Sequence, residues 1–165
     1  MSRTKVAILG CGFISDIHVE SYERFVPEAE VVAVYSRDLT KAKAFAEKHH
    51  IKAWYDSIDK IITDSGCEIV DICLPNFLHA QATLKAARAK KHIIIEKPLA
   101  VTLEEADEMI SVCEKQGVKL MYAEELCFAP KYERVRNLVK EGAIGNIYQL
   151  KQAEKHSGPH SDWFY

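Results

Sequence analysis

The chain has 165 residues, the size of one domain with room for a short extra segment. Hydrophobic residues make up 48% of it and the formal net charge is −2, so a substantial core is expected and disorder is not. Charges of both signs are dispersed, which excludes a nucleic-acid surface or a basic membrane patch. No apolar run is long enough to span a membrane, and we expect no signal peptide. The five cysteines include no Cys-x-x-Cys pair, which predicts reduced thiols in a cytoplasmic protein.

Short apolar runs alternate with amphipathic segments over most of the chain. The runs cover residues 6–9, 31–35, 69–74, 93–95 and 120–123. They lack the polar alternation of a half-exposed strand, so both of their faces should be covered. The pattern predicts an α/β fold, a doubly wound parallel sheet between helix layers, complete by about residue 123.

The segments between the runs carry signals for helix ends. Thr102 and Glu105 form a capping-box pattern, and Gly117 suits the left-handed position that ends the helix. Asn76 is expected to cap a helix that runs to about residue 90, and Ser57 to cap a shorter one.

Residues 124–165 differ from the rest of the chain. Pro130 is expected to open a helix that Gly142 closes, and residues 147–153 are predicted to form a strand. The chain ends on large aromatic residues, which is unusual for a natural domain end. We therefore expect a domain over residues 1–123, followed by the truncated start of a second α/β domain.

A glycine loop follows the first apolar run. Gly10 would permit a tight turn and Gly12 a close approach of the backbone to a pyrophosphate. The helix that starts at Phe13 and Ile14 would direct N–H groups at that anion, and Ser15 is small enough to replace the usual third glycine. A glycine-rich turn without a ligand is the alternative. The strand–loop–helix context favours dinucleotide binding.

The end of the second apolar run bears on the choice of cofactor. An acidic residue there would bind the ribose hydroxyls of NAD, but the position holds Ser36, and Arg37 follows. Arg37 could pair with a 2′-phosphate, so NADP(H) is favoured and NAD(H) remains possible. A solvated Arg37 is the alternative. Asp38 is expected to cap the next helix.

Two further run ends are rich in polar groups. After the third run, Leu74 leads into Pro75 and Asn76, which offers an amide, and His79 follows one turn later. His79 could face the nicotinamide ribose, although a packed or surface histidine is an equal alternative. Leu74, Asn76 and His79 are therefore candidate cofactor-binding residues.

Glu96 and Lys97 follow the triple-isoleucine run. A charged pair that abuts a buried strand is costly unless it is paired or used. Lys97 could hydrogen-bond a substrate hydroxyl or carbonyl and is the candidate catalytic residue, and both residues are candidates for cofactor binding. A purely structural Glu96–Lys97 pair is the alternative.

Four motifs occur in order at natural spacings, and together they resemble the Gfo/Idh/MocA family, named for glucose–fructose oxidoreductase and inositol dehydrogenase. The motifs are the glycine loop with His18, Ser36-Arg37, Pro75-Asn76 with His79, and Glu96-Lys97-Pro98-Leu99. The resemblance also covers Glu141-Gly-Ala-Ile-Gly145 and so extends over essentially the whole chain.

This resemblance implies a Rossmann nucleotide-binding domain and a second α/β domain for substrate binding and oligomerisation, of which residues 124–165 would be the start. It implies an NAD(P)-dependent dehydrogenase that moves hydride between nicotinamide and a sugar, polyol or diol. Lys97 would help position cofactor and substrate, with an Asp and a His of the second domain adding acid–base chemistry. It also favours a cis Lys97–Pro98 bond and a homo-oligomer. The alternative is a non-catalytic nucleotide-binding module or an inactive truncated remnant.

His156, His160 and Asp162 are the residues that invite a metal interpretation. Their spacing fits neither a helix face nor an established zinc pattern. We expect no metal site.

Overall fold

The computed structural model describes residues 2–153 and 155 of the chain. The chain divides into two units, Met1–Ala123 and Glu124–Tyr165, which are described separately. None of the helices in the described residues has the length and apolar character needed to cross a membrane.

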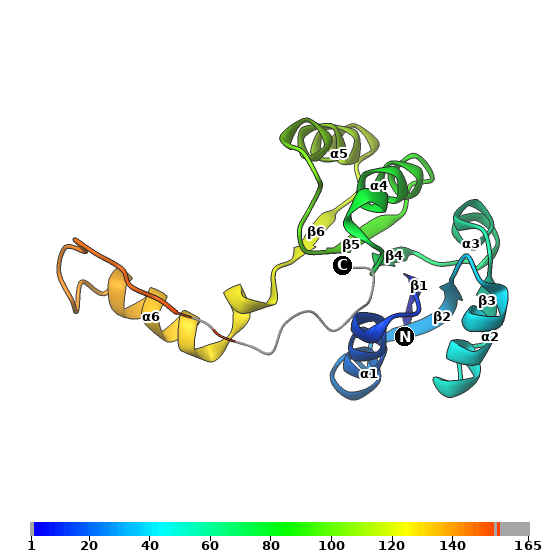
Figure 1. The fold of residues 1–165 in the computed structure, drawn as a ribbon, viewed down its shortest axis with the longest axis horizontal. Coiled ribbons are helices and arrows are strands. Elements are labelled where there is room, and N and C mark those ends of the chain that lie inside the picture. The colour runs from blue at the N-terminus through cyan, green and yellow to red at the C-terminus, as the bar shows by residue number, and fades with distance from the viewer. Residues whose placement is uncertain (1, 154, 156–165) are drawn as a thin grey trace. The chain divides into compact units, whose positions relative to one another are not determined.

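A six-stranded parallel sheet forms the centre of the first unit, in the order β3-β2-β1-β4-β5-β6 (Figure 1). The strands are β1 Thr4–Leu9, β2 Ala29–Tyr35, β3 Ala53–Tyr55, β4 Ile69–Ile72, β5 His92–Glu96 and β6 Leu120–Ala123. The order reverses between β1 and β4, the arrangement of a Rossmann fold, so the predicted fold class is confirmed. The sequence did not reveal β3, whose three residues at the sheet edge form no long apolar run.

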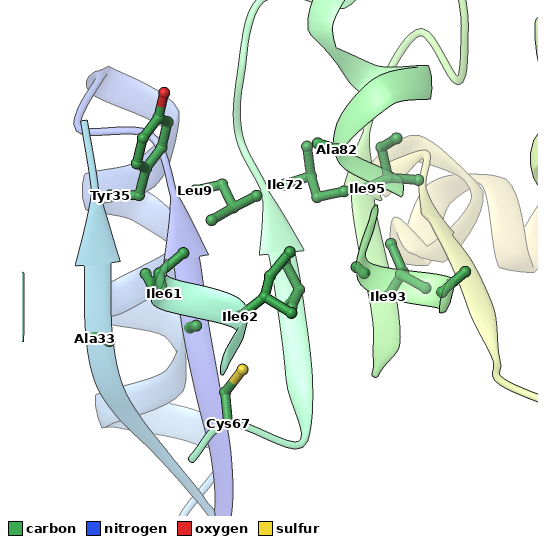
Figure 2. Close-up of a cluster of buried hydrophobic side chains, with 14 of the residues drawn as sticks. Leu9, Ala33, Tyr35, Ile61, Ile62, Cys67, Ile72, Ala82, Ile93 and Ile95 are labelled. Carbon is green, nitrogen blue, oxygen red and sulfur yellow. The ribbon is translucent and has the colours of Figure 1, made fainter. Parts of the chain in front are cut away.

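Helices cover both faces of this sheet. They are α1 Phe13–Phe25, α2 Leu39–Lys48, α3 Ile58–Asp64, α4 His79–Arg88 and α5 Leu103–Gln116. Buried residues of α1 and α2 pack with one set of strand side chains, including Val6 and Ile8. The alternate side chains of β1, Ala7 and Leu9, face the opposite way and pack with buried residues of α3, α4 and α5. Figure 2 shows Leu9 in this cluster with Ile61 and Ile62 of α3 and Ala82 of α4. This alternation explains why strands covered on both faces appear as continuous apolar runs.

Three of the predicted helix ends are confirmed. The Ser57 hydroxyl accepts the N–H of Lys60, and Thr102 Oγ1 accepts the N–H of Glu105. The reciprocal bond of the capping box is shifted by one residue. The Glu105 carboxylate accepts the N–H of Val101 and not that of the cap residue Thr102. Gly117 ends α5 with a φ of 68°.

Asn76 does not cap a long helix as predicted. It begins a 3-10 turn, Asn76–Leu78, and α4 starts only at His79, with no side-chain cap. The N–H of Leu78 donates to the carbonyl of Pro75 at 2.9 Å, and this bond closes the tight turn before the α-helix can begin.

The second unit contains the predicted helix but not the predicted strand. A 3-10 turn, Glu125–Phe128, precedes α6, Pro130–Lys140, and Gly142 follows with a φ of 70°. Residues 147–153 form no strand, because the described part of this unit offers no other strand to pair with them. Self-association of the chain stays a prediction.

Candidate functional site

The candidate residues lie at the carboxyl ends of adjacent parallel strands. In the sheet order β2-β1-β4-β5, the residues that follow these strands all lie at the carboxyl ends of the strands, and we call this side of the sheet its carboxyl edge. This edge receives Ser36 after β2, the glycine loop after β1, Leu74 after β4 and Lys97 after β5. The reversal of strand order places the glycine loop in the middle, which is where open α/β sheets bind ligands.

Gly10 is required by its backbone and by its surroundings. Its φ is 124°, and a Cβ at this position would overlap the carbonyl oxygen of Cys73. The loop after β1 therefore lies directly against the end of β4.

Gly12 has a different role in the same loop. Its φ of −101° is ordinary, and a Cβ built on it meets nothing within 4 Å, so the space beside it is open. It precedes α1, whose first turn, from Phe13 and Ile14, directs N–H groups outward along the helix axis. Ser15 is fully buried and its hydroxyl accepts the Gly12 N–H at 3.3 Å, so Ser15 gives the close packing expected of it.

The residues after β2 carry exposed positive charge without an acidic residue at the strand end. Ser36 accepts the N–H of Asp38, and Arg37 is exposed and makes no ion pair within the described residues. Asp38 caps α2 as predicted, because its carboxylate accepts the N–H groups of Thr40 and Lys41.

His79 does not lie where cofactor contact was expected. Its side chain is fully buried, and its ring nitrogens lie 2.8 Å from the carbonyl oxygens of Leu74 and Pro98. It therefore holds the loop after β4 against the loop after β5, as the packed alternative required. Leu74 and Asn76 remain partly exposed at the edge.

Glu96 and Lys97 have separate environments. Lys97 is exposed, and the Lys97–Pro98 bond is cis, as predicted. Glu96 is buried, and both of its carboxylate oxygens are engaged. Oε1 lies 3.1 Å from Nε2 of His18, and Oε2 accepts the Lys97 N–H at 3.1 Å. Both carboxylate oxygens of Glu96 thus bond within the protein, and its expected contact with a cofactor stays a prediction.

A partly buried polar network includes Glu96, and we call its members the His18 cluster: His18, Tyr22, Asp71, Cys73 and Glu96. Nδ1 of His18 lies 2.9 Å from the Asp71 carboxylate, which also accepts the Tyr22 hydroxyl at 3.0 Å. The Cys73 thiol lies 3.7 Å from Asp71. Sequence reasoning assigned no role to these contacts. A signal was present, because Asp71 is a charged residue inside an apolar strand and is fully buried.

The charges of the His18 cluster follow from its geometry. Burial alone would lower the pKa of His18, but hydrogen bonds to Asp71, Cys73 and Glu96 outweigh it and raise the pKa to about 12. Burial raises the pKa of Glu96, but the hydrogen bond and charge of His18 lower it overall. Burial and the charge of Asp71 raise the pKa of the Cys73 thiol to about 12 and also raise that of Tyr22. The cluster is thus an imidazolium held between two carboxylates.

Potential metal-ligating atoms of His18, Asp71 and Cys73 lie within 4.8 Å of one another. Hydrogen bonds among these groups already account for their proximity. The residues considered from the sequence, His156, His160 and Asp162, lie outside the described residues.

Comparison with known proteins agrees with this geometry. Residues 4–124 match the model of the oxidoreductase family with an NAD-binding Rossmann fold, Gfo/Idh/MocA. The chain is 35% identical over 147 residues to D-glucoside 3-dehydrogenase of Escherichia coli, covering 89% of this chain and 42% of the relative. It is 33% identical over 145 residues to trans-1,2-dihydrobenzene-1,2-diol dehydrogenase of Xenopus tropicalis, covering 87% and 44%.

A solved structure shows the same fold. It is scyllo-inositol dehydrogenase from Lactobacillus casei with bound NAD(H) and scyllo-inositol, which matches with a TM-score of 0.83 at 22% identity and covers 88% of this chain and 43% of that one. The chain thus spans less than half the length of the relatives it matches. With the family model matching most of its length, the chain belongs to the Gfo/Idh/MocA oxidoreductases and comprises their NAD-binding Rossmann domain.

Proposed function

We propose that the chain is the cofactor-binding part of an NAD(P)-dependent dehydrogenase that acts on a CH–OH group of a sugar, polyol or diol. The observation that carries this proposal is the open space at Gly12, beside the start of α1, on the same sheet edge as the exposed Lys97. Relatives named for a D-glucoside and for a dihydrodiol support the class of substrate.

The loop residues fit a dinucleotide. Gly12 leaves room for a pyrophosphate, and the N–H groups at Phe13 and Ile14 offer it the positive end of the α1 dipole. The β2 side of the edge would take the adenosine half, where Ser36 and Arg37 lie. The nicotinamide half would then lie toward β4 and β5.

Arg37 supports a preference for NADP(H). A guanidinium matches a phosphate dianion with paired hydrogen bonds. The position directly after β2 holds Ser36, so there is no carboxylate at that position to repel the phosphate. NAD(H) remains the alternative cofactor, since the inositol dehydrogenase of similar fold was solved with NAD(H) bound.

On the β4 and β5 side, Leu74 and Asn76 would lie against the nicotinamide. The Asn76 amide would offer it hydrogen bonds. Lys97 would donate a hydrogen bond to the oxygen of the reacting carbon and hold or release its proton. A bound nicotinamide supplies the hydride chemistry at that carbon.

A non-catalytic nucleotide-binding module is the second candidate, and it would use the same glycine loop at the same end of the strands. Cytoplasmic location and self-association also stay predictions. The prediction of a cytoplasmic location rests on the cysteines, because all five lie in the described residues and are free thiols.

Replacing Gly12 tests nucleotide binding directly. Because a Cβ at Gly12 meets nothing within 4 Å and φ is ordinary, Gly12→Ala should leave the thermal midpoint unchanged. The added methyl group would occupy the space for the pyrophosphate, so calorimetry should show at least about a tenfold loss of affinity for NADPH and NADH. Unchanged affinity for both would exclude the proposed site.

A further inference from the structure

The His18 cluster connects the helix after the glycine loop to the residue before Lys97. His18 lies in α1, and its Nε2 is 3.1 Å from Oε1 of Glu96, the last residue of β5. The other carboxylate oxygen of Glu96 accepts the backbone N–H of Lys97 at 3.1 Å. Two hydrogen bonds thus separate His18 from the backbone of the candidate catalytic lysine.

Both ring nitrogens of His18 face carboxylates, those of Asp71 and Glu96. A neutral imidazole has only one N–H, so with both carboxyl groups ionised the two contacts are both hydrogen bonds only when the ring is doubly protonated. The raised pKa of His18 is consistent with that state near neutral pH. A doubly charge-assisted bridge of this kind is stronger and more directional than neutral hydrogen bonds.

The groups around His18 come from three elements. Tyr22 lies on α1 with His18, Asp71 and Cys73 come from β4 and its end, and Glu96 comes from β5. Asp71 is held from two further directions, by the Tyr22 hydroxyl and the Cys73 thiol. Glu96, by contrast, bonds to the side chain of His18 alone among the members of this cluster, so its orientation depends chiefly on that bond.

We infer that His18 is a positioning residue for Lys97, acting as an imidazolium that orients Glu96 and, through Glu96, the backbone N–H of Lys97. The inference deepens the proposed function and rests on it, because it assigns Lys97 to the nicotinamide side of the site. Lys97 follows β5, on the opposite side of the strand-order reversal from Arg37, so disturbing this link should affect only the nicotinamide half of a bound cofactor.

Two substitutions of His18 separate its two bonds. In His18→Asn the side-chain amide lies near the former Nδ1, so it can still donate to Asp71 but does not reach Glu96. In His18→Gln the amide lies near the former Nε2 and can still donate to Glu96. Tyr22→Phe is the matched control, since it removes a hydrogen bond to Asp71 and leaves Glu96 untouched.

The first measurement compares calorimetric affinities for NADPH and for 2′-phospho-ADP-ribose, which lacks the nicotinamide ring, in buffer with a metal chelator. His18→Asn should weaken NADPH binding about tenfold and leave the fragment unchanged, as expected for one lost hydrogen bond near a charged group. His18→Gln should recover most of the loss, and Tyr22→Phe should bind both ligands as the wild type does. An equal loss for both ligands in His18→Asn, or no loss for either, would overturn the inference.

The second measurement uses a double-mutant cycle with Lys97→Met. If His18 acts through Lys97, His18→Asn should not lower the NADPH affinity further once Lys97 is absent. Additive losses would mean that His18 acts by another route and would refute the positioning role. If His18→Asn does not fold, Glu96→Asp shortens the same link and should lower the ratio of NADPH to fragment affinity in the same way, and an unchanged ratio would count against the inference.

The third measurement needs no cofactor. The Lys97 amide should exchange with solvent several-fold faster in His18→Asn than in the wild type and in His18→Gln, measured by NMR. Equal exchange in all three proteins would overturn the inference even if nucleotide binding is normal. A wild type that binds neither ligand would refute the proposed function, and the Lys97 amide would still decide the positioning role.

Discussion

The carbonyl oxygen of Cys73 occupies the space that a Cβ on Gly10 would need. Two loops that follow neighbouring strands, β1 and β4, therefore lie so close together that no side chain fits at position 10. Gly12, two residues further on, is open on its side-chain face. The two glycines of one motif thus differ: Gly10 is required by the fold, whereas Gly12 leaves open the space that we propose for the ligand.

Gly10→Ala should destabilise the protein, whereas Gly12→Ala should not. The alanine at position 10 would combine a positive φ with an overlap against backbone, at a cost of about 2–4 kcal/mol in the free energy of unfolding. Urea unfolding of the two variants beside the wild type measures the difference. Equal midpoints for Gly10→Ala and the wild type would show that the loop relaxes freely and that the close approach has no energetic role.

Arg37→Ala should selectively weaken binding of NADP(H). The loss of a charge-assisted phosphate contact costs on the order of 1.5–3 kcal/mol, and NAD(H), which has no 2′-phosphate, should be affected far less. Arg88→Ala is the matched control. It removes the same charge from the end of α4. This helix end precedes the start of β5 and so lies at the amino ends of the strands, opposite to Arg37.

Calorimetric titration of both variants with NADPH and NADH decides the question. Equal wild-type affinities for the two cofactors would contradict the NADP(H) preference, as would an NADPH affinity that survives in Arg37→Ala.

The stability contributed by His18 should depend on pH. Its folded-state pKa is raised to about 12, above an unfolded value near 6.5, so the folded state holds a proton that the unfolded state loses. The contribution is fully present below about pH 6.5 and declines as the pH rises from there toward 12. The groups that hold the proton are the carboxylates of Asp71 and Glu96, with Cys73 and Tyr22 beside them.

Urea unfolding at several pH values between 6 and 8.5 tests this, with the window kept below 9.0, the ordinary pKa of a thiol, so that Cys73 stays mostly protonated in both states. The difference in unfolding free energy between wild type and His18→Gln should shrink steadily across that range. A difference that stays constant with pH would mean that the pKa of His18 is the same in the folded and the unfolded protein, contrary to the prediction.

The strands and most helix ends were predictable from the sequence because they depend on local patterns. Ser57 and Thr102 cap helices through bonds to residues three positions away, and the buried strands appear as apolar runs. The strand predicted at residues 147–153 was wrong because a strand requires a partner strand, and a local sequence pattern does not show whether one is present. β3 was missed because three residues at a sheet edge carry too little signal.

The site was predictable as a set of strand ends but not as a network. Arg37, Gly12 and Lys97 lie at the expected edge, since parallel strands bring their carboxyl ends together. The partners of Asp71 and Glu96 come from α1, far away in the sequence, and only tertiary packing brings His18 to them. His79 was left open between two interpretations because its burial depends on the positions of two loops, after β4 and after β5.

The 165-residue chain should bind nucleotide but turn over polyols and diols weakly. In the proposed site Lys97 would be one proton donor at the nicotinamide side. The chain matches only 42–44% of the length of two relatives that are named as dehydrogenases, so the groups that hold substrate should come largely from elsewhere. A steady-state assay at saturating NADP⁺ with a glucoside, an inositol and a diol as substrates is the test, with Lys97→Met and the exposed-lysine control Lys119→Met alongside. Residual turnover should disappear in Lys97→Met and persist in Lys119→Met. Lys119 precedes β6 and so lies at the amino ends of the strands, away from Lys97 at their carboxyl ends. A wild-type rate of about 1 per second or more, ordinary for a complete enzyme, would show that the chain holds its own substrate site.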